Sequence, residues 1–139
     1  MVVDFNPWYF SSADVLVHRF YSAIAQAINE QFFFPDLIAL TRKYSRMLAP
    51  ILKRFGLEAN PGESSVEEIK RQVENYILQT GRRVVVIIDD VDRTNPDELL
   101  WVFRTVRLAA DFKKTIFLLA FDNSQVVEQL CAPGSPSFG

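Results

Sequence analysis

The chain is short of cysteine, histidine and glycine, with one, one and five of them among its 139 residues. A lone cysteine, Cys131, cannot close an internal disulfide, which disfavours a secreted scaffold stapled by disulfides. The single histidine, His18, has no nearby cysteine, so a zinc site or histidine acid–base catalysis has little support. Five glycines also leave little room for a glycine-rich loop.

The chain also lacks an excess of positive charge and a long apolar run. Fifteen Lys and Arg residues stand against seventeen Asp and Glu residues, which gives a formal net charge of −2. No global positive field is therefore available to hold a nucleic-acid backbone, and nucleic acid is not an expected partner. No run approaches the roughly 20 apolar residues that span a bilayer, and no charged-then-apolar leader opens the chain. We therefore expect a cytoplasmic protein.

What the chain does contain predicts one globular α/β domain. Hydrophobic residues make up 49% and charged residues 23%, a composition that supports a real core. Apolar, β-branched segments predict strands at 2–6, 84–88 and 115–121. Apolar residues at helical spacing predict helices over about 12–30, about 37–55, from 64 or 65 to 81, from 96 onward and over 122–130. This alternation predicts a parallel sheet with flanking helices, built through right-handed crossovers.

Several side chains mark the expected ends of these helices. Ser11, three residues before Asp14, forms a variant of the capping box for the first helix. Gly56 is expected to end the second helix as its C′ residue, and Ser64 or Ser65 to begin the third. Each end is fixed by a residue that satisfies backbone groups which the helix leaves without a partner.

The later elements carry equally clear signals. Thr94 or Asn95 is expected to cap a helix that has Pro96 at its first position. The run from Val84 to Ile88 is five consecutive β-branched apolar residues, which is typical of a strand buried on both faces. We therefore expect helices on both sides of the sheet.

Polar residues follow each expected strand, at Asp4-Phe5-Asn6, at Asp89-Asp90-Val91-Asp92-Arg93 and at Phe121-Asp122-Asn123. Ligands of open parallel sheets bind beyond the carboxyl ends of the strands, so these residues are the candidates for chemistry. An aliphatic strand that runs into Asp-Asp has the form of a Walker B segment. There the first acid holds Mg²⁺ through its waters and the second polarises the attacking water. The alternative is that the acids only let the chain leave the core and cap the next helix, which suits Asp92 better than Asp89.

Three segments together resemble the KAP family of P-loop NTPases over about residues 2–130. They are Phe5-Asn6-Pro7-Trp8-Tyr9-Phe10, the sequence VVVIIDDVDR from Val84 to Arg93, and IFLLAFD from Ile116 to Asp122. The resemblance implies a P-loop NTPase-like fold of the additional-strand class, with the Walker B strand next to the P-loop strand.

The resemblance also implies roles for individual residues. Asp89 becomes the ligand of the Mg²⁺ waters and Asp90 the catalytic acid that acts on ATP. Arg93 becomes a phosphate-facing or structural arginine, and Asp122 a sensor-like polar group in the cofactor site. Many members of the family are membrane-associated, which extends the expected location to the inner face of a membrane.

The chain departs from the family at the phosphate-binding loop. It has no G-x-x-x-x-G-K-[ST] sequence, and its only glycines five residues apart, Gly134 and Gly139, have no lysine after them. We therefore expect residues 1–130 to form a partial domain that lacks the first strand and the P-loop. In this partial domain 31–62 is a helical insertion and 131–139 a flexible tail. Hydrolysis by this chain alone is not expected. The Val84–Ile88 strand is expected to expose an unpaired apolar edge, which favours self-association.

Other functions remain open at this stage. The chain fits a non-catalytic protein-interaction module that kept the sheet and lost nucleotide chemistry. Phosphoacceptor receiver domains also end a strand in paired acids, but here three helices precede Asp89. Within 42–54 the basic residues form either a solvated helix face or a surface for anionic lipid, with Phe32-Phe33-Phe34 inserting at the interface. These basic residues are Arg42, Lys43, Arg46, Lys53 and Arg54.

Overall fold

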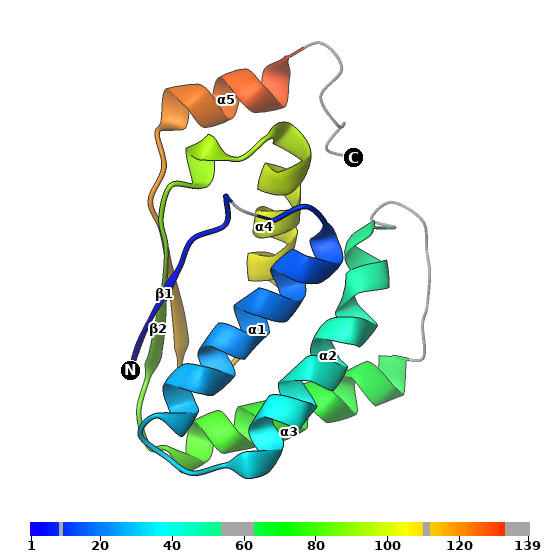
Figure 1. Cartoon of the computed structure of the whole chain (residues 1–139), viewed down its shortest axis with the longest axis vertical. Coiled ribbons are helices and arrows are strands. Elements are labelled where there is room, and N and C mark those ends of the chain that lie inside the picture. The colour runs from blue at the N-terminus through cyan, green and yellow to red at the C-terminus, as the bar shows by residue number, and fades with distance from the viewer. Residues whose placement is uncertain (9, 54–62, 110–111, 133–139) are drawn as a thin grey trace.

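The computed structural model has a three-stranded sheet with helices beside it and describes residues 1–8, 10–53, 63–109 and 112–132 (Figure 1). Its elements in chain order are β1 (Val2–Phe5), α1 (Ala13–Asn29), α2 (Pro35–Lys53), α3 (Glu63–Gln79), β2 (Val84–Ile88), the short 3₁₀ helix η1 (Val91–Arg93), α4 (Pro96–Ala109), β3 (Thr115–Leu119) and α5 (Asn123–Cys131). The predicted order of strands and helices is confirmed. The predicted tail at 131–139 and the predicted helix end at Gly56 fall almost entirely outside the described residues.

The sheet is parallel throughout, in the order β1-β2-β3. The register places Phe5 opposite Ile88 and Ile88 opposite Leu119, so the three strands end at nearly the same level. The first and third strands end one and two residues earlier than the sequence predicted. The parallel α/β sheet itself is confirmed.

One prediction about this sheet is wrong. The strand β2 hydrogen-bonds to β1 on one side and to β3 on the other, so it exposes no unpaired edge. No place is left beside β2 for a P-loop strand, which the resemblance had placed there. Among the described strands, the open edges belong to β1 and β3. Any further strand of this sheet must pair with one of them.

The helices lie on one side of the sheet, apart from α5, which lies across the carboxyl ends of the strands (Figure 1). The strand order advances in one direction, and right-handed crossovers in one direction place all their helices on the same face. Burial alternates along β2 accordingly: Val84, Val86 and Ile88 are buried, whereas Val85 and Ile87 are only half-buried. The expectation that β2 is covered on both faces is therefore wrong.

The opposite face of the sheet, which we call the bare face, is uncovered in the part of the chain that the structure describes. It consists of Val2, Asp4, Val85, Ile87, Ile116 and Leu118. Three of its apolar side chains are largely in solvent, with exposed fractions of 61% for Val2, 40% for Ile116 and 51% for Leu118. The described structure therefore presents an apolar surface on this side of the sheet.

The helices begin where local chemistry predicts, with two small shifts. The N-cap of α1 is Ser12 and not Ser11, and its hydroxyl accepts a hydrogen bond from the Val15 N–H at 3.4 Å. Asn95 caps α4 as predicted: the Asn95 carboxamide accepts from the Glu98 N–H at 2.9 Å, and the Glu98 carboxylate accepts from the Asn95 N–H at 3.1 Å. This reciprocal pair is a capping box that fixes where α4 begins. The third helix begins earlier than expected, at Glu63, so Ser64 and Ser65 lie inside its first turn.

Aromatic rings join the sheet to the helices that cover it. Phe20 of α1 lies against Phe5 of β1 at 5.3 Å and Phe117 of β3 at 6.0 Å between ring centroids. Tyr21 meets Tyr44 of α2 at 4.9 Å and Phe112 at 6.0 Å. These contacts make α1 the element that joins the sheet to the outer helices.

We predict that Phe20→Ala destabilises the fold by about 3–5 kcal/mol, because it leaves a cavity between α1 and the sheet. Phe33→Ala is the matched control, since that ring is 87% exposed and its removal changes the free energy of unfolding by less than about 0.5 kcal/mol. Denaturant unfolding of both variants measures the difference. Equal midpoints would contradict the central position of Phe20.

Candidate functional site

The turn that follows β2 lies at the carboxyl edge of the sheet, between the ends of its two neighbours. The Asp89 N–H donates to the Phe5 carbonyl at 3.4 Å, which holds the turn to β1. The Ala120 N–H donates to the Ile88 carbonyl at 2.8 Å, and the Val91 N–H donates to the Ala120 carbonyl at 3.4 Å, which holds it to the segment after β3. The residues predicted to carry chemistry therefore begin at the carboxyl edge of the sheet, and the position of β2 places them at its centre, which the sequence did not predict.

Asp90 has left-handed backbone angles, with φ 56° and ψ 32°. Aspartate is one of the few residues other than glycine that adopt this conformation readily, because its short polar side chain bonds to nearby backbone. Here the bond comes from the preceding residue: the Asp89 carboxylate accepts from the Asp90 N–H at 2.8 Å. The left-handed residue reverses the chain directly after the strand and starts η1. Asp89 stays exposed at the edge of the sheet.

Arg93 lies against Asp90 and forms an ion pair with it, at 3.0 Å from Nε to Oδ1. The short 3₁₀ helix between them brings residues three apart together. The two side chains are 31% and 63% exposed for Asp90 and Arg93, so the pair adds little stability, about 0–1 kcal/mol. Its effect is positional, since it fixes the carboxylate of Asp90.

Asp122 is the N-cap of α5. Its Oδ1 accepts from the Ser124 N–H at 2.8 Å, from the Ser124 hydroxyl at 2.6 Å and from the Gln125 N–H at 3.4 Å. These bonds, the Ser124 hydroxyl first, lower the pKa of Asp122 below its ordinary value of 3.8, because they favour the charged carboxylate. The resemblance implied a sensor-like role for Asp122, and the sequence also predicted a helix that begins at this residue. In this structure Asp122 caps that helix.

Helix α5 is tied to the turn by a residue that sequence reasoning missed. The Gln129 side-chain amide donates to the Asp92 carbonyl at 2.8 Å, across 37 positions of sequence. Val126 is the buried residue of α5, and the helix contacts η1. A glutamine on a short polar helix carries no sequence signal for such a role, since its partner is a backbone carbonyl fixed only by the fold.

The carboxylates at the sheet edge do not form a metal site by themselves. Within the described ranges, no group of three or more His, Cys, Asp or Glu side chains is arranged to hold a metal ion. Asp89 is exposed and presents one carboxylate, which is a donor set that suits Mg²⁺ only together with water and phosphate oxygens. Among the described residues, this donor set is therefore compatible with a Mg²⁺ ion shared with a nucleotide and does not hold the ion by itself.

Only some of the residues that were predicted to form a lipid surface are both described by the structure and exposed to solvent. Arg42, Lys43 and Arg46 are exposed on α2, whereas the side chains of residues 53 and 54 lie outside the described part. Phe32 and Phe34 stack on each other at 6.2 Å and are half-buried, so of the three phenylalanines only Phe33 projects into solvent. In the described ranges, no helix has the length and apolar character to cross a membrane.

Comparison with known families gives one match that covers nearly the whole chain. The family described as KAP family P-loop domain matches residues 1–134. Neither the curated proteins nor the solved structures compared with the chain give a match. The family found here is the one that the three sequence segments predicted.

We predict that Ser124→Ala raises the pKa of Asp122 while leaving it below 3.8, because the hydroxyl bond is lost and both backbone bonds remain. Gln125→Ala, which keeps its backbone N–H, leaves that pKa unchanged. Carboxyl-detected NMR titration measures both. The stabilisation from this cap is present above the unfolded pKa and disappears as the pH falls through the folded pKa. In Ser124→Ala it therefore disappears at higher pH, and an identical titration in all three proteins would contradict the assignment.

Proposed function

Because this chain belongs to the KAP family of P-loop domains, we propose that it forms the Walker B part of a domain that binds and hydrolyses ATP with Mg²⁺. The observation that carries the proposal is the turn after β2. There the exposed Asp89, the left-handed Asp90 and its partner Arg93 follow the central strand of a parallel sheet. Polar groups at the carboxyl edge of such a sheet are where its ligands bind.

Each residue of the turn has a distinct task in this proposal. When bound, Mg²⁺ would supply positive charge that neutralises the phosphates of the nucleotide. Asp89 would hold the waters of that ion with the carboxylate oxygen that the Asp90 N–H leaves available. Asp90 orients the attacking water and takes its proton. Asp122 contributes a fixed negative polar group at the neighbouring strand end, where α5 begins.

Arg93 connects nucleotide binding to the state of Asp90. In the structure its guanidinium pairs with the Asp90 carboxylate at 3.0 Å. A phosphate group nearby offers Arg93 a second anionic partner with better bidentate geometry. Transfer of Arg93 to the phosphate frees Asp90 to act as a base. In this proposal Arg93 is therefore a partner that Asp90 shares with the phosphate of the nucleotide.

Two features of the sheet support a P-loop unit supplied by further polypeptide. The β3 edge is open, and the bare face next to it is apolar. Suppose that a further strand pairs with β3 and is followed in the chain by β1. Its connection then runs across the sheet in the direction opposite to the connections from β1 to β2 and from β2 to β3. A right-handed crossover in that direction would place its helix on the bare face. The phosphate loop between that strand and helix would then lie beside Asp89 and Asp122.

The contacts of α5 suggest how the nucleotide state reaches an attached effector. Gln129 holds the Asp92 carbonyl, and Asp92 lies between Asp90 and Arg93 in the turn. When Arg93 moves from Asp90 to a phosphate, η1 moves with it, and α5 is hydrogen-bonded to η1. We therefore infer that α5 is the output element of the switch.

The proposal predicts Mg-ATP turnover only in a longer chain that includes an apolar strand and G-x-x-x-x-G-K-[ST] before Met1. In that chain Asp90→Asn lowers kcat by about 10²–10⁴-fold, because asparagine keeps the left-handed backbone and cannot take the proton. Asp92→Asn is the matched control and leaves turnover close to that of the parent, since only the backbone carbonyl of Asp92 makes the bond to Gln129. Steady-state phosphate release measures all three. Turnover by the 139-residue chain alone would overturn the need for a further unit.

A second candidate is the non-catalytic interaction module, and the observation that favours it is the bare face. In this candidate a second copy of the chain covers the face, and no nucleotide is involved. Absence of G-x-x-x-x-G-K-[ST] from the coding sequence upstream of Met1 would favour it over the ATPase.

This candidate predicts that Ile116→Lys with Leu118→Lys converts the chain to a monomer, because two charges on β3 oppose burial of that face. The control is Ile38→Lys with Val127→Lys, which adds the same charge at two exposed apolar helix positions. Sedimentation velocity distinguishes the two variants. A parent chain that is already monomeric, or a control that dissociates equally, would contradict self-association through the bare face.

A further inference from the structure

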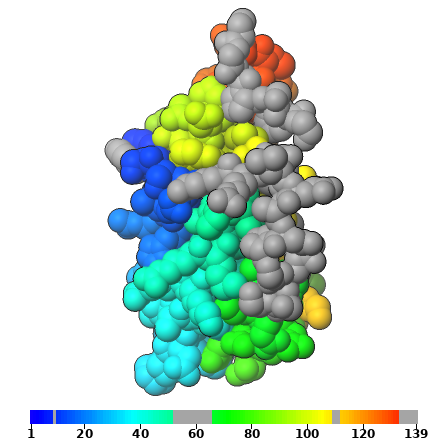
Figure 2. All heavy atoms as spheres, turned by 90° about the vertical axis from the view of Figure 1, so that its right-hand side faces the viewer, coloured from blue at the N-terminus to red at the C-terminus, as the bar shows by residue number. Residues whose placement is uncertain are grey.

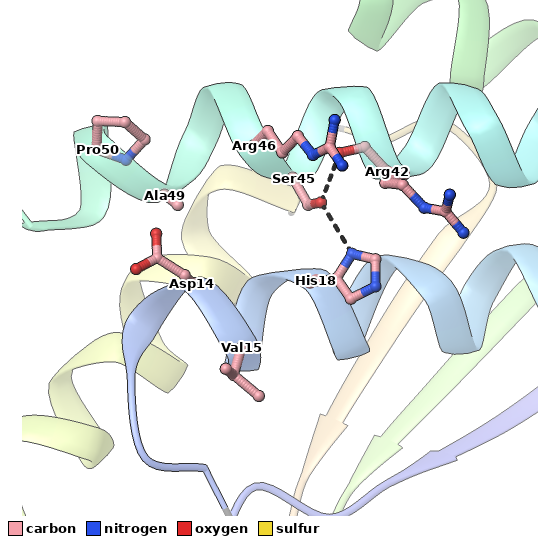
Figure 3. A pocket seen from close by; sticks show the side chains of 8 residues that line it. All are labelled: Asp14, Val15, His18, Arg42, Ser45, Arg46, Ala49 and Pro50. Carbon is pink, nitrogen blue, oxygen red and sulfur yellow. Dashed lines mark hydrogen bonds between the residues drawn. The ribbon is translucent and has the colours of Figure 1, made fainter.

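A groove of about 500 Å³ lies between α1 and α2, and none of the residues that line it belongs to the turn that carries the proposed ATPase site. Figure 2 shows the side of the molecule where α2 runs between α1 and α3. The residues that line the groove are Asp14, Val15 and His18 of α1 and Arg42, Ser45, Arg46, Ala49 and Pro50 of α2 (Figure 3). This groove plays no part in the function proposed above.

The two helices leave room here because α2 presents small residues toward α1. Ser45 and Ala49 are buried, at 2% and 3% exposed, four positions apart on one helix face. The longer side chains of Arg42 and Arg46 flank them on the same face and reach solvent. Small side chains therefore form the floor of the groove, and positively charged side chains form its rim.

The charges of the rim favour an anion. Arg42 and Arg46 are one helical turn apart, a spacing at which like charges repel. Of the described residues that line the groove, Asp14 alone is acidic, and it lies at the opposite end from the Arg42 guanidinium (Figure 3). An anion between the two arginines turns their repulsion into attraction. Guanidinium groups match the oxygens of phosphate with paired hydrogen bonds.

The histidine is oriented by the floor of the groove. The Ser45 hydroxyl donates to the Arg42 carbonyl at 2.9 Å, and Ser45 Oγ lies 3.4 Å from His18 Nδ1. Because the hydroxyl proton is used on the carbonyl, Ser45 accepts from His18 Nδ1–H. The other ring nitrogen, Nε2, lies on the side of the imidazole away from Ser45 (Figure 3). His18 thus has one nitrogen fixed by the protein. The other nitrogen accepts a hydrogen bond from a phosphate O–H when the ring is neutral and donates one to a phosphate oxygen when the ring is an imidazolium.

We propose that the groove between α1 and α2 binds a phosphate-bearing anion, with the guanidinium groups of Arg42 and Arg46 and the imidazole of His18 as its ligands. The sequence had left the basic residues of α2 as either a solvated face or a broad lipid surface. The groove selects two of them and adds a histidine from α1, which makes a localised site. The phosphate comes either from a soluble molecule or from a lipid headgroup, and the recognition chemistry is the same.

The test uses the ring resonances of His18, which are unambiguous because the chain has one histidine. The full 139-residue chain is titrated with sodium phosphate and, at equal ionic strength and pH, with sodium chloride. We expect a saturable shift of the His18 signals with phosphate that chloride does not produce. Arg42→Gln with Arg46→Gln weakens the apparent affinity by at least about 10-fold, because two charge-assisted contacts are lost.

The matched control is Arg19→Gln with Lys43→Gln, which removes the same charge from exposed positions of the same two helices outside the groove. It keeps the affinity of the parent chain, and circular dichroism establishes that both double variants are folded. The proposal is overturned if phosphate and chloride act alike on His18, or if the two double variants lose affinity equally.

Two further arms distinguish the sources of the phosphate. Phosphatidylcholine vesicles are prepared with and without phosphatidic acid, and co-sedimentation of the chain is measured. Binding that requires phosphatidic acid and is reversed by free phosphate assigns the groove to a lipid headgroup. Binding of free phosphate without vesicle binding assigns it to a soluble phosphate ester. Vesicle binding that the Arg42→Gln, Arg46→Gln variant retains in full overturns the groove as the lipid site.

Discussion

The direction in which the strands of the sheet follow one another is the constraint on which the rest of this structure depends. β1, β2 and β3 are neighbours in chain order, and a right-handed connection that always advances places its helices on one face. That single rule leaves the bare face in the described structure. It also puts β2 in the centre, with both of its edges paired, and so places the Asp89–Arg93 turn in the middle of the carboxyl edge.

The turn and the last helix form one connected unit. Asp90 takes a left-handed conformation that reverses the chain, Arg93 returns to pair with it, and Gln129 of α5 holds the carbonyl between them. None of these contacts is strong by itself, since the ion pair is largely exposed. Weak contacts of this kind suit a switch, because a bound phosphate competes with them easily. This is the physical basis for proposing α5 as the output of an ATPase cycle.

The packing of α1 on α2 is a second and separate determinant. The rings of Tyr21 and Tyr44 pack against each other with their centroids 4.9 Å apart, and the small residues Ser45 and Ala49 leave a groove nearby. The cationic side chains of α2 rise around it as they would on any amphipathic helix. What distinguishes this face is the histidine that α1 contributes. The proposed phosphate groove therefore depends on helix packing, while the proposed nucleotide site depends on strand order.

The sequence by itself determined the elements, their order, the parallel sheet and the family, because hydrophobic periodicity and the residues at strand ends are local properties of the chain. It also indicated Asp122 at the start of the last helix and offered Thr94 or Asn95 as the cap of α4, of which the structure selects Asn95; a cap needs only its own next three residues. Two predictions about the Val84–Ile88 strand, its unpaired edge and its cover on both faces, were wrong. A run of valine and isoleucine shows that a strand is apolar, but it does not show which strands pair with it or which helices cover it. Only the tertiary structure decided that one face of the described sheet stays bare, that Arg93 pairs with Asp90, that Gln129 bonds to the turn and that His18 lines the same groove as Arg42 and Arg46. Each of these joins side chains to groups whose positions are fixed by the path of the chain through space.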